Sequence, residues 1–316
     1  MKGFDAEFPD LDTYIRVITA RIWEGRRLDD IRRYYADPCT VETPTGLTTT
    51  AQQVVDGTAA TLAMFPDRRL LAEDIIVSGN EDGGFLSSHR IVSTMTHRGD
   101  GAFGPATGRR IHVRTVADCV CRDNRVVHEW LVRDQSAIAR QIGLEPRELA
   151  RRWLEERGGW QPPPPTTAPA PYRPHLSDEA PARACAEALH GWARGRTDVA
   201  AVYDEAVHHL GPGETTRYGR DEVQAFWEGL FRTFEAEHLE VEHLALQRGD
   251  GRADRVAMRW RAQTRHTGAG AWGPATGRRV QILGIWHAEL LHGRVLREWV
   301  LLDEVALWMQ VLGERA

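Results

Sequence analysis

One seven-residue segment occurs twice in this chain, and this repetition constrains the fold more than any other feature. The segment 104–110, Gly-Pro-Ala-Thr-Gly-Arg-Arg, recurs unchanged at 273–279, an offset of 169 positions. The same offset brings further identical residues into register, among them Trp23/Trp192, Asp29/Asp198, Tyr34/Tyr203, Arg90/Arg259, His97/His266, Glu129/Glu298, Trp130/Trp299 and Asp134/Asp303. About two dozen identities over about 120 paired positions indicate a duplicated domain. The sequence therefore predicts two copies of one fold, aligned without a gap.

A proline-rich segment separates the two copies. Four consecutive prolines stand at 162–165, and proline lacks a backbone donor and favours an extended chain. We predict a first domain over residues 1–157, a semi-rigid linker over 158–176 and a second domain over 177–316. A ligand for a proline-binding module is the alternative interpretation of the linker.

Each copy has helical patterns first and strand patterns later. In the first copy, apolar residues recur at helical spacing over 14–22, and further helices are expected at 28–35 and 50–64. Strand-like runs follow, with glycine and asparagine turns between them, at 74–78, 85–96, 109–121 and 126–132. This order predicts an α+β fold in which N-terminal helices pack on one face of a curved antiparallel sheet.

Composition and charge exclude several classes of protein. The net charge of -5 and the scattered arginines give no basic surface for nucleic acid. No stretch approaches the roughly 20 apolar residues of a membrane span, and acids stand near the start where a signal peptide is apolar. The four cysteines do not match between the copies, so we expect no repeated disulfide or metal site. The sequence predicts a reduced, cytoplasmic protein.

The run 109–121 predicts a strand whose two faces differ. Side chains alternate across a sheet, so Ala117 and Cys119 point one way and Asp118 the other. We expect the first set to face the helices and line a cavity, in which Trp286 is the counterpart of Ala117. The opposite set includes Leu283 in the second copy, which predicts that this face is covered, most simply by the sheet of the other copy.

Titratable residues recur at the ends of the predicted strands. His97 and His266 precede glycine turns, where a neutral imidazole can transfer a proton near pH 7. The alternative is a histidine that holds the turn by hydrogen bonds. Asp134 and Asp303 precede short apolar helices, which is the pattern of a helix N-cap, with a catalytic base as the alternative.

Arginines offer a second type of candidate. Arg90 and Arg109 recur in both copies and are able to bind a carboxylate or an enolate. Pairing with a neighbouring acid explains their presence equally well. No phosphate-binding loop, nucleophile elbow, zinc-binding helix or dinucleotide fingerprint occurs in the sequence, so we expect no cofactor.

Aromatic residues complete the candidate set. Trp130 and Trp299 follow a glutamate on the last predicted strand and are expected in the core or the cavity wall, with ligand contact as the alternative. Tyr34 and Tyr203 are expected on helices that face the sheet. At a cavity edge, a tyrosine is able to donate to a substrate carbonyl.

Several of these residues, taken in order, resemble one known family. His97, the segment 104–110, Glu129-Trp130, Asp134 and the run 141–143 resemble the SnoaL-like polyketide cyclases of the nuclear transport factor 2-like superfamily, and the second copy repeats the series. The resemblance implies two tandem cone-shaped barrels, each with one apolar cavity. It also implies pairing through the backs of the sheets, here as an intrachain pseudo-dimer, with a homodimer also possible.

The resemblance further implies a reaction. Such cyclases close a polyketide ester by aldol chemistry without cofactor or metal, using an aspartate on the third strand. In this sequence, the positions that correspond to this aspartate hold Ala117 and Trp286, whose side chains cannot transfer a proton. A one-residue slip in register would turn Asp118 inward, and His287 holds the matching place in the second copy.

Two functional hypotheses follow. The first is a cyclase or isomerase that acts on a carbonyl or polyketide-like small molecule, with a base drawn from His97, Asp118 or Asp134 and an enolate held by Arg109 or Tyr34. The second is a non-catalytic protein that binds an apolar metabolite, or a scaffold with degenerate cavities. A division of labour is the third possibility, with the first copy active because its wall residues Ala117 and Thr115 are small. Trp286, also a candidate for substrate contact, is expected to fill the second cavity in part.

Overall fold

The computed structural model describes residues 1–268 and 270–313, which divide into two compact units. The first domain comprises Met1–Leu149 with Gln161–Pro174, and the second comprises Ala150–Trp160 with the chain from His175 onward. Most of the proline-rich segment therefore packs on the first domain. There Thr166 donates to the Glu42 carboxylate, and Arg122 donates to the Pro171 carbonyl.

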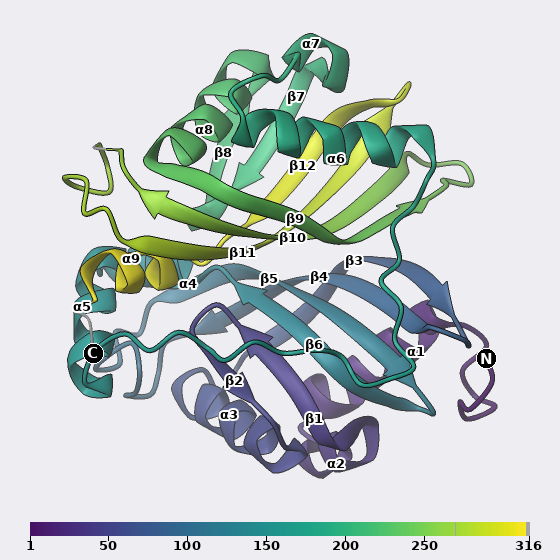
Figure 1. The fold of residues 1–316 in the computed structure, drawn as a ribbon. Coiled ribbons are helices and arrows are strands. Elements are labelled where there is room, and N and C mark those ends of the chain that lie inside the picture. Colours follow the sequence, from purple (N-terminus) through teal and green to yellow (C-terminus); the bar gives the residue numbers. More distant parts are fainter. Residues whose placement is uncertain (269, 314–316) are drawn as a thin grey trace. The chain divides into compact units, whose positions relative to one another are not determined.

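The first domain is built on a six-stranded sheet with the order β2-β1-β6-β5-β4-β3 (Figure 1). Its strands are β1 (Tyr35–Thr43), β2 (Gly46–Thr48), β3 (Arg69–Asn80), β4 (Gly84–Thr96), β5 (Arg110–Arg122) and β6 (Arg125–Arg133). Strand β1 pairs parallel to β6, and the other neighbours are antiparallel, so the sheet is mixed rather than antiparallel. β2 and β3 form its two edges, and the described strands make an open curved sheet instead of a closed barrel.

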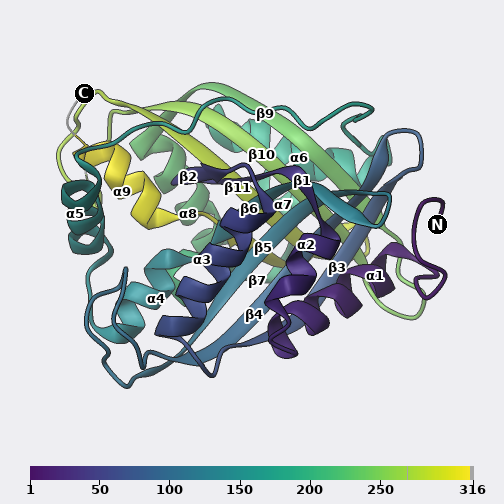
Figure 2. The ribbon, with the colours of Figure 1, turned by 90° about the horizontal axis from the view of Figure 1, so that it is seen from below.

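Helices cover the concave face of this sheet (Figure 2). The helices of the first domain are α1 (Leu11–Thr19), α2 (Ile31–Tyr34), α3 (Ala51–Met64) and α4 (Gln135–Ile142), and α5 (Pro146–Arg157) runs across the boundary between the two domains. The Asp10 and Thr50 side chains cap α1 and α3 by accepting from free backbone amides. α1 continues as a π-helical turn over Ala20–Glu24, an irregularity that is frequent at functional sites. The sequence predicted helices near α1–α4 but not α5.

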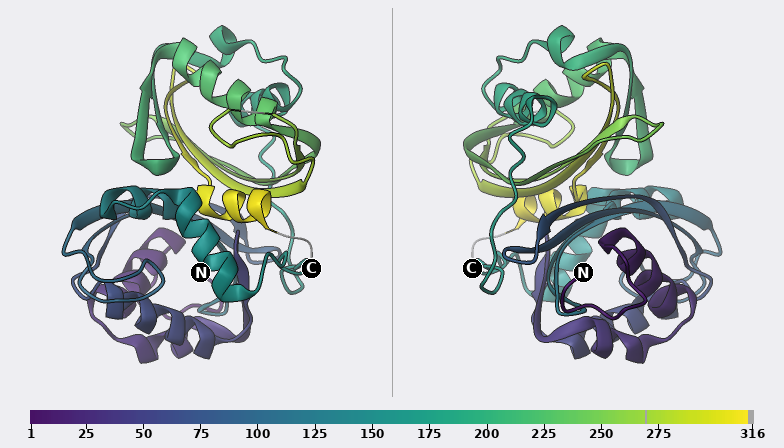
Figure 3. Two further views of the ribbon diagram at one scale, coloured as in Figure 1. Left: turned by 90° about the vertical axis from the view of Figure 1, so that its left-hand side faces the viewer. Right: turned by 90° about the vertical axis from the view of Figure 1, so that its right-hand side faces the viewer.

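The second domain repeats the arrangement with sheet order β8-β7-β12-β11-β10-β9 (Figure 3). Its strands are β7 (Tyr203–Gly211), β8 (Thr215–Tyr218), β9 (Phe234–Gln247), β10 (Asp254–His266), β11 (Arg279–Leu291) and β12 (Arg294–Leu301). Its helices are α6 (Ala180–Ala193), α7 (Val199–Val202), α8 (Gly219–Thr233) and α9 (Glu304–Leu312). The predicted duplication of one α+β fold is confirmed.

The two copies are not aligned without a gap, however. Tyr35 and Tyr203 open the equivalent strands β1 and β7 and pair with Val126 and Val295, so the offset here is 168. The loop before α7 is one residue shorter than its counterpart, and Pro212–Glu214 make the β7–β8 turn one residue longer. These two changes cancel, which hid the shift in the sequence. The pairing of Tyr34 with Tyr203 was therefore wrong by one residue.

Both domains carry a β-bulge in the last strand. In the first domain Cys121 pairs with Val126 but Val120 pairs with His128, so Val127 is the extra residue. β12 has the same irregularity between its pairs Leu290–Val295 and Glu289–Arg297. A bulge reverses which side chains of the strand point inward beyond it. As a result, Glu129 and Glu298 face the helices, and the tryptophans that follow them do not.

The described part of the chain contains no helix with the length and apolar character needed to cross a membrane. Leu283, predicted on the face of β11 opposite the helices, is buried, as expected for a covered surface. The pairing of the two domains stays a prediction.

Candidate active site

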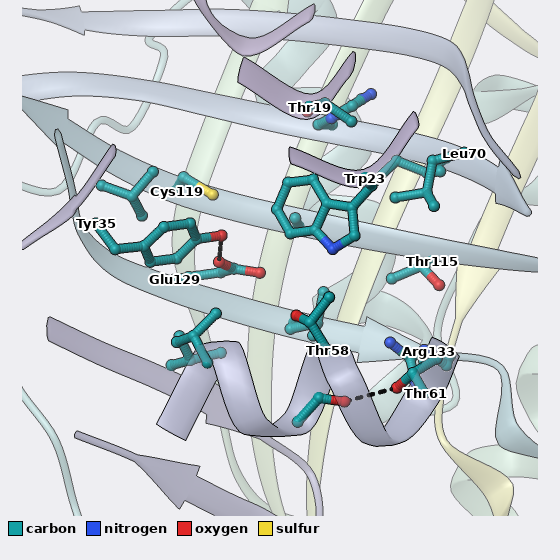
Figure 4. Close-up of a pocket in the computed structure, with 18 of the residues that line it drawn as sticks. Thr19, Trp23, Tyr35, Thr58, Thr61, Leu70, Thr115, Cys119, Glu129 and Arg133 are labelled. Atoms are coloured by element: carbon teal, nitrogen blue, oxygen red, sulfur yellow. Dashed lines mark hydrogen bonds between the residues drawn. The ribbon is translucent and has the colours of Figure 1, made fainter. Parts of the chain in front are cut away.

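The first domain encloses a cavity of about 270 Å³ between its helices and the sheet (Figure 4). As predicted from the alternation along β5, Thr115, Ala117 and Cys119 line it, and Asp118 does not. Trp23, on the π-helical turn, forms part of the helical wall. The lining residues Gln53 and Gly57 of α3 are exposed, so the cavity opens beside this helix.

Glu129 is the acid of this cavity. Tyr35 donates to its Oε2 at 2.7 Å, and both side chains are buried. The other carboxylate oxygen makes no hydrogen bond to the described residues. Burial raises the pKa of Glu129, against the hydrogen bond from Tyr35 and the charge of Arg133, which both lower it. A carboxyl group with a raised pKa in an apolar cavity is suited to proton transfer.

His89 lies across the sheet from Glu129. It pairs with Ala117 between β4 and β5, while Glu129 on β6 pairs with Cys119, two residues further along β5. The small Ala117 side chain therefore leaves room between an imidazole and a carboxylate. Burial, with the charges of nearby arginines, lowers the pKa of His89 to about 3. The ring is neutral near pH 7, and its buried Nε2 has no partner among the described residues.

The opposite end of the cavity is basic. Arg68, Arg133 and Thr115 line this end, and Figure 4 shows Arg133 and Thr115 on the side away from Tyr35 and Glu129. Burial is the largest cause of a lowered pKa at Arg68, and the charge of Arg133 adds to it. The cavity thus has an acidic and a basic end, joined by walls of apolar residues and threonines.

The corresponding hollow of the second domain is filled. Its volume is about 10 Å³, no more than the roughly 10–15 Å³ that a single water molecule needs. Trp286 stands in place of Ala117, and Trp227 in place of Thr58. Trp260 packs over Gly284, where a Cβ atom would lie 2.3 Å from the indole. The prediction that Trp286 fills this cavity is confirmed.

Glu298, the counterpart of Glu129, is surrounded by donors. Tyr203 donates to its Oε2 at 3.0 Å and Trp286 Nε1 donates to the same oxygen at 2.6 Å. Trp227 Nε1 donates to Oε1 at 3.4 Å, and His209 Nδ1 lies 2.6 Å from that oxygen. Side chains of the second domain thus surround both oxygens of Glu298, whereas Glu129 has one oxygen without a hydrogen bond to the described residues.

The predicted histidines and aspartates at strand ends lie outside the cavity lining. His97 Nδ1 lies 3.2 Å from Thr107 Oγ1, and His266 Nδ1 lies 3.0 Å from Thr276 Oγ1, so each ring contacts the repeated glycine-rich loop. Burial lowers the pKa of both rings. Asp134 caps α4 by accepting from Ala137 N at 3.0 Å, and Asp303 caps α9 in the same way. The N-cap prediction is confirmed.

The other charged candidates also lie away from the cavity. Asp118 and His287 are buried but line neither hollow, so the one-residue slip that would turn Asp118 inward does not occur. Arg90 forms an ion pair with Glu73 at 3.0 Å, as the alternative interpretation predicted. Arg109 is exposed and donates to the Gln141 carbonyl at 3.3 Å.

The predicted aromatic residues are divided between core and cavity wall. Tyr34 is buried outside the cavity lining, and its hydroxyl accepts from Arg21 at 2.6 Å. Trp130 packs against His128 with ring centroids 4.0 Å apart, and like Trp299 it lines neither hollow. Tyr203 lines the small hollow of the second domain, with Trp286.

Glu129, Tyr35 and His89 were not among the predicted site residues. The constant offset of 169 pairs Tyr203 with Tyr34, the neighbour of Tyr35. Alternation alone does not show which residues of β6 face inward. Two features of the sequence point to these residues. Glu129 is repeated as Glu298, and His89 lies on the same face of β4 as Ile91, which lines the cavity. Within residues 1–268 and 270–313, no group of three or more His, Cys, Asp or Glu side chains is arranged to hold a metal ion.

Comparisons with known proteins address the family. The family model of SnoaL-like polyketide cyclases matches residues 13–142 and 183–311, and no curated protein matches the chain. Among solved structures, the polyketide cyclase candidate IdmH from Streptomyces antibioticus is 22% identical over 42% of this chain and 98% of its own, with a TM-score of 0.37. AclR from Streptomyces galilaeus, titled a hydroxylase candidate, is 23% identical over 42% of this chain and 80% of its own, also with a TM-score of 0.37. Because the family model matches most of both domains, the chain belongs to the SnoaL-like polyketide cyclase family, in two tandem copies.

Proposed function

We propose that the first domain is a cofactor-free enzyme that transfers a proton on a small carbonyl or polyketide-like substrate, as a cyclase or isomerase does. The observation that carries this proposal is the open, singly bonded carboxylate of Glu129 in a cavity of about 270 Å³. Glu129 takes the role that an aspartate on β5 holds in the family resemblance. Its pairing with Cys119 sets it beside the space that Ala117 leaves open.

The neighbouring groups fit defined roles in this chemistry. The Glu129 carboxylate removes a proton from the carbon next to the substrate carbonyl, and the enolate forms with its negative charge on oxygen. Neutral His89 offers an N–H donor to that oxygen from the opposite side of Ala117. Tyr35 fixes the orientation of the carboxylate. The carboxylic acid then returns its proton, to the original carbon or to a new position.

The second domain is proposed as non-catalytic. Trp227 and Trp286 occupy its hollow, and no described space for a substrate remains beside Glu298. This favours the division of labour between the copies, with a scaffold role for the second.

Proton exchange tests the proposal without knowledge of the natural substrate. Cyclic β-keto esters incubated in D₂O exchange the acidic α-proton, and NMR follows the loss of its signal. We expect the wild-type protein to accelerate exchange of at least one such ester, and Glu129→Gln to reduce the acceleration at least 100-fold. Glu298→Gln is the matched control and should retain the rate. Equal rates for wild type and Glu129→Gln would refute the role of Glu129.

A further inference from the structure

Arg68 is a buried cation that forms no ion pair with a carboxylate among residues 1–268 and 270–313. Only 5% of its surface is exposed, and its Nε and Nη2 atoms donate to Ser93 Oγ at 3.4 and 3.3 Å. Within the described residues, no acid lies within ion-pair distance of its guanidinium. Glu24 is the acid that acts on it through charge, but Glu24 binds Leu70 N and Arg69. Buried charges in folded proteins are usually paired, so this arrangement points to a missing anion.

A second arginine and an unbonded hydroxyl lie at the same end of the cavity. Arg133 on β6 is the cross-strand neighbour of Thr115 on β5, and both line the cavity (Figure 4). The Thr115 hydroxyl is buried and makes no hydrogen bond to the described residues. Ser93, which binds Arg68, lies two residues from Ile91, the neighbour of Thr115 on β4. Two positive charges and a hydroxyl donor thus lie at the same end of the cavity.

The second domain lacks all three groups. At the offset of 169, Arg68 corresponds to Glu237, Arg133 to Leu302 and Thr115 to Gly284. Glu237 is exposed and pairs with Arg265 instead of entering the hollow. If the arginines served to stabilise the fold, the same fold would need them in both copies. They occur only in the domain whose cavity is open.

We infer that Arg68, Arg133 and Thr115 form a binding site for a carboxylate group of the ligand. Guanidinium groups bind carboxylates through paired charge-assisted hydrogen bonds, and the threonine hydroxyl supplies one more donor. This inference deepens the proposed function, because it names the substrate class as apolar carbonyl compounds that carry a carboxylate. Glu129 and Arg133 are four residues apart on β6, so about 13 Å separates the backbone positions of the two ends. The carboxylate would orient the carbonyl toward Glu129.

Binding of a matched pair of probes tests the site. 2-Naphthoate and 2-naphthamide have nearly the same shape, but only the first carries a negative charge at pH 7.5. Isothermal titration calorimetry on the full-length protein should show naphthoate binding at least tenfold more tightly than naphthamide. Arg68→Gln should abolish this preference while naphthamide binding changes less than twofold. Arg110→Gln, which removes an exposed arginine at the start of β5, is the control and should keep the preference.

Each outcome decides the question. Equal affinity of the two probes for the wild type would overturn the inference, and so would a retained preference in Arg68→Gln. If Arg68→Gln does not fold, the comparison of probes on the wild type and on Arg133→Gln still decides. Glu129→Gln separates this inference from the proposed function. A preference for naphthoate in that variant, together with unchanged proton exchange, would support the carboxylate site and refute the catalytic role of Glu129.

Discussion

Tyr35 donates a hydrogen bond of 2.7 Å to Glu129, and Tyr203 makes the equivalent bond of 3.0 Å to Glu298. The two pairs begin alike and then differ, since Glu298 has further contacts with His209, Trp227 and Trp286, whereas Glu129 faces an open cavity. The same buried Tyr–Glu pair therefore occurs twice in this protein. In the second domain both carboxylate oxygens contact other side chains, and in the first domain one oxygen faces the cavity. Each domain is therefore an internal control for the other.

Replacing the two glutamates should change stability in opposite directions. The folded-state pKa of Glu129 is raised above its ordinary value of 4.5, mainly by burial. Its contribution to stability is therefore fully present below pH 4.5 and is lost as the pH rises through the raised pKa. Glutamine imitates the protonated acid, so Glu129→Gln should stabilise the protein by about 1 kcal/mol at pH 8, a rise of about 2–4 °C in Tm.

Glu298→Gln should destabilise the protein instead. The donors around Glu298 bind two carboxylate oxygens, whereas a glutamine amide has only one acceptor oxygen. Each hydrogen bond to a charged group contributes about 1.5–3 kcal/mol. We expect a loss of about 2–3 kcal/mol by thermal unfolding at pH 8. The gain from Glu129→Gln should disappear at pH 4, and a constant gain at both pH values would contradict the assignment of Glu129.

Tyr35→Phe should move the pH dependence of proton exchange. The Tyr35 hydrogen bond lowers the pKa of Glu129, so its removal raises that pKa further. A general base acts only when it is deprotonated, and the rising limb of the pH–rate profile should therefore shift to higher pH. Tyr203→Phe is the matched change and should leave the profile unmoved. A shift toward lower pH in Tyr35→Phe would exclude Glu129 as the base.

Ala117→Trp should convert the first cavity into a copy of the second. Trp286 occupies the equivalent place and donates to Glu298 at 2.6 Å. The cavity of about 270 Å³ has space for an indole, so we expect the variant to fold with its Tm within a few degrees of wild type. Naphthoate binding and proton exchange should both be lost. The reverse change, Trp286→Ala, should destabilise by about 3–5 kcal/mol, because it leaves a large void in a packed core.

His89→Met should make the protein more resistant to acid. Burial lowers the pKa of His89 to about 3 from its ordinary value of 6.5. The stability that comes from the neutral ring is present above pH 6.5 and is lost as the pH falls toward 3, by at most about 1.4 kcal/mol for each pH unit. Methionine is the residue at the equivalent position, Met258, and it does not titrate. Thermal unfolding between pH 7 and pH 4 should show a smaller decrease in Tm for the variant than for wild type.

Much of the fold followed from local patterns in the sequence. The alternation along β5 correctly placed Ala117 inward and Asp118 outward, because a long central strand keeps its period. β1 and β2 were not predicted, since Tyr35–Thr43 contains Asp37 and Pro38 and its apolar residues do not alternate regularly. β1 is held by parallel pairing to β6, and its first pair, Tyr35 and Val126, is 91 positions apart in the sequence. No local pattern reveals such a pairing.

The acid of the site could not be read from alternation alone. A regular strand without the bulge at Val127, starting with inward Val126, would present His128 and Trp130 to the cavity. The bulge instead presents Glu129 and Leu131. The arginines at the basic end of the cavity were not predicted for a different reason. Arg68 precedes β3 and Arg133 ends β6, so only the folded sheet brings them together.

The extra residue in β6 also bears on how this family can change its chemistry. If Val127 paired regularly instead of bulging, Trp130 would replace Glu129 at the wall without any change in the sequence. In such a strand, the presence of the bulge selects which side chain faces the cavity, a carboxylate with the bulge and an indole without it. Searches for the catalytic acid in relatives should therefore compare strand registers before they compare residues.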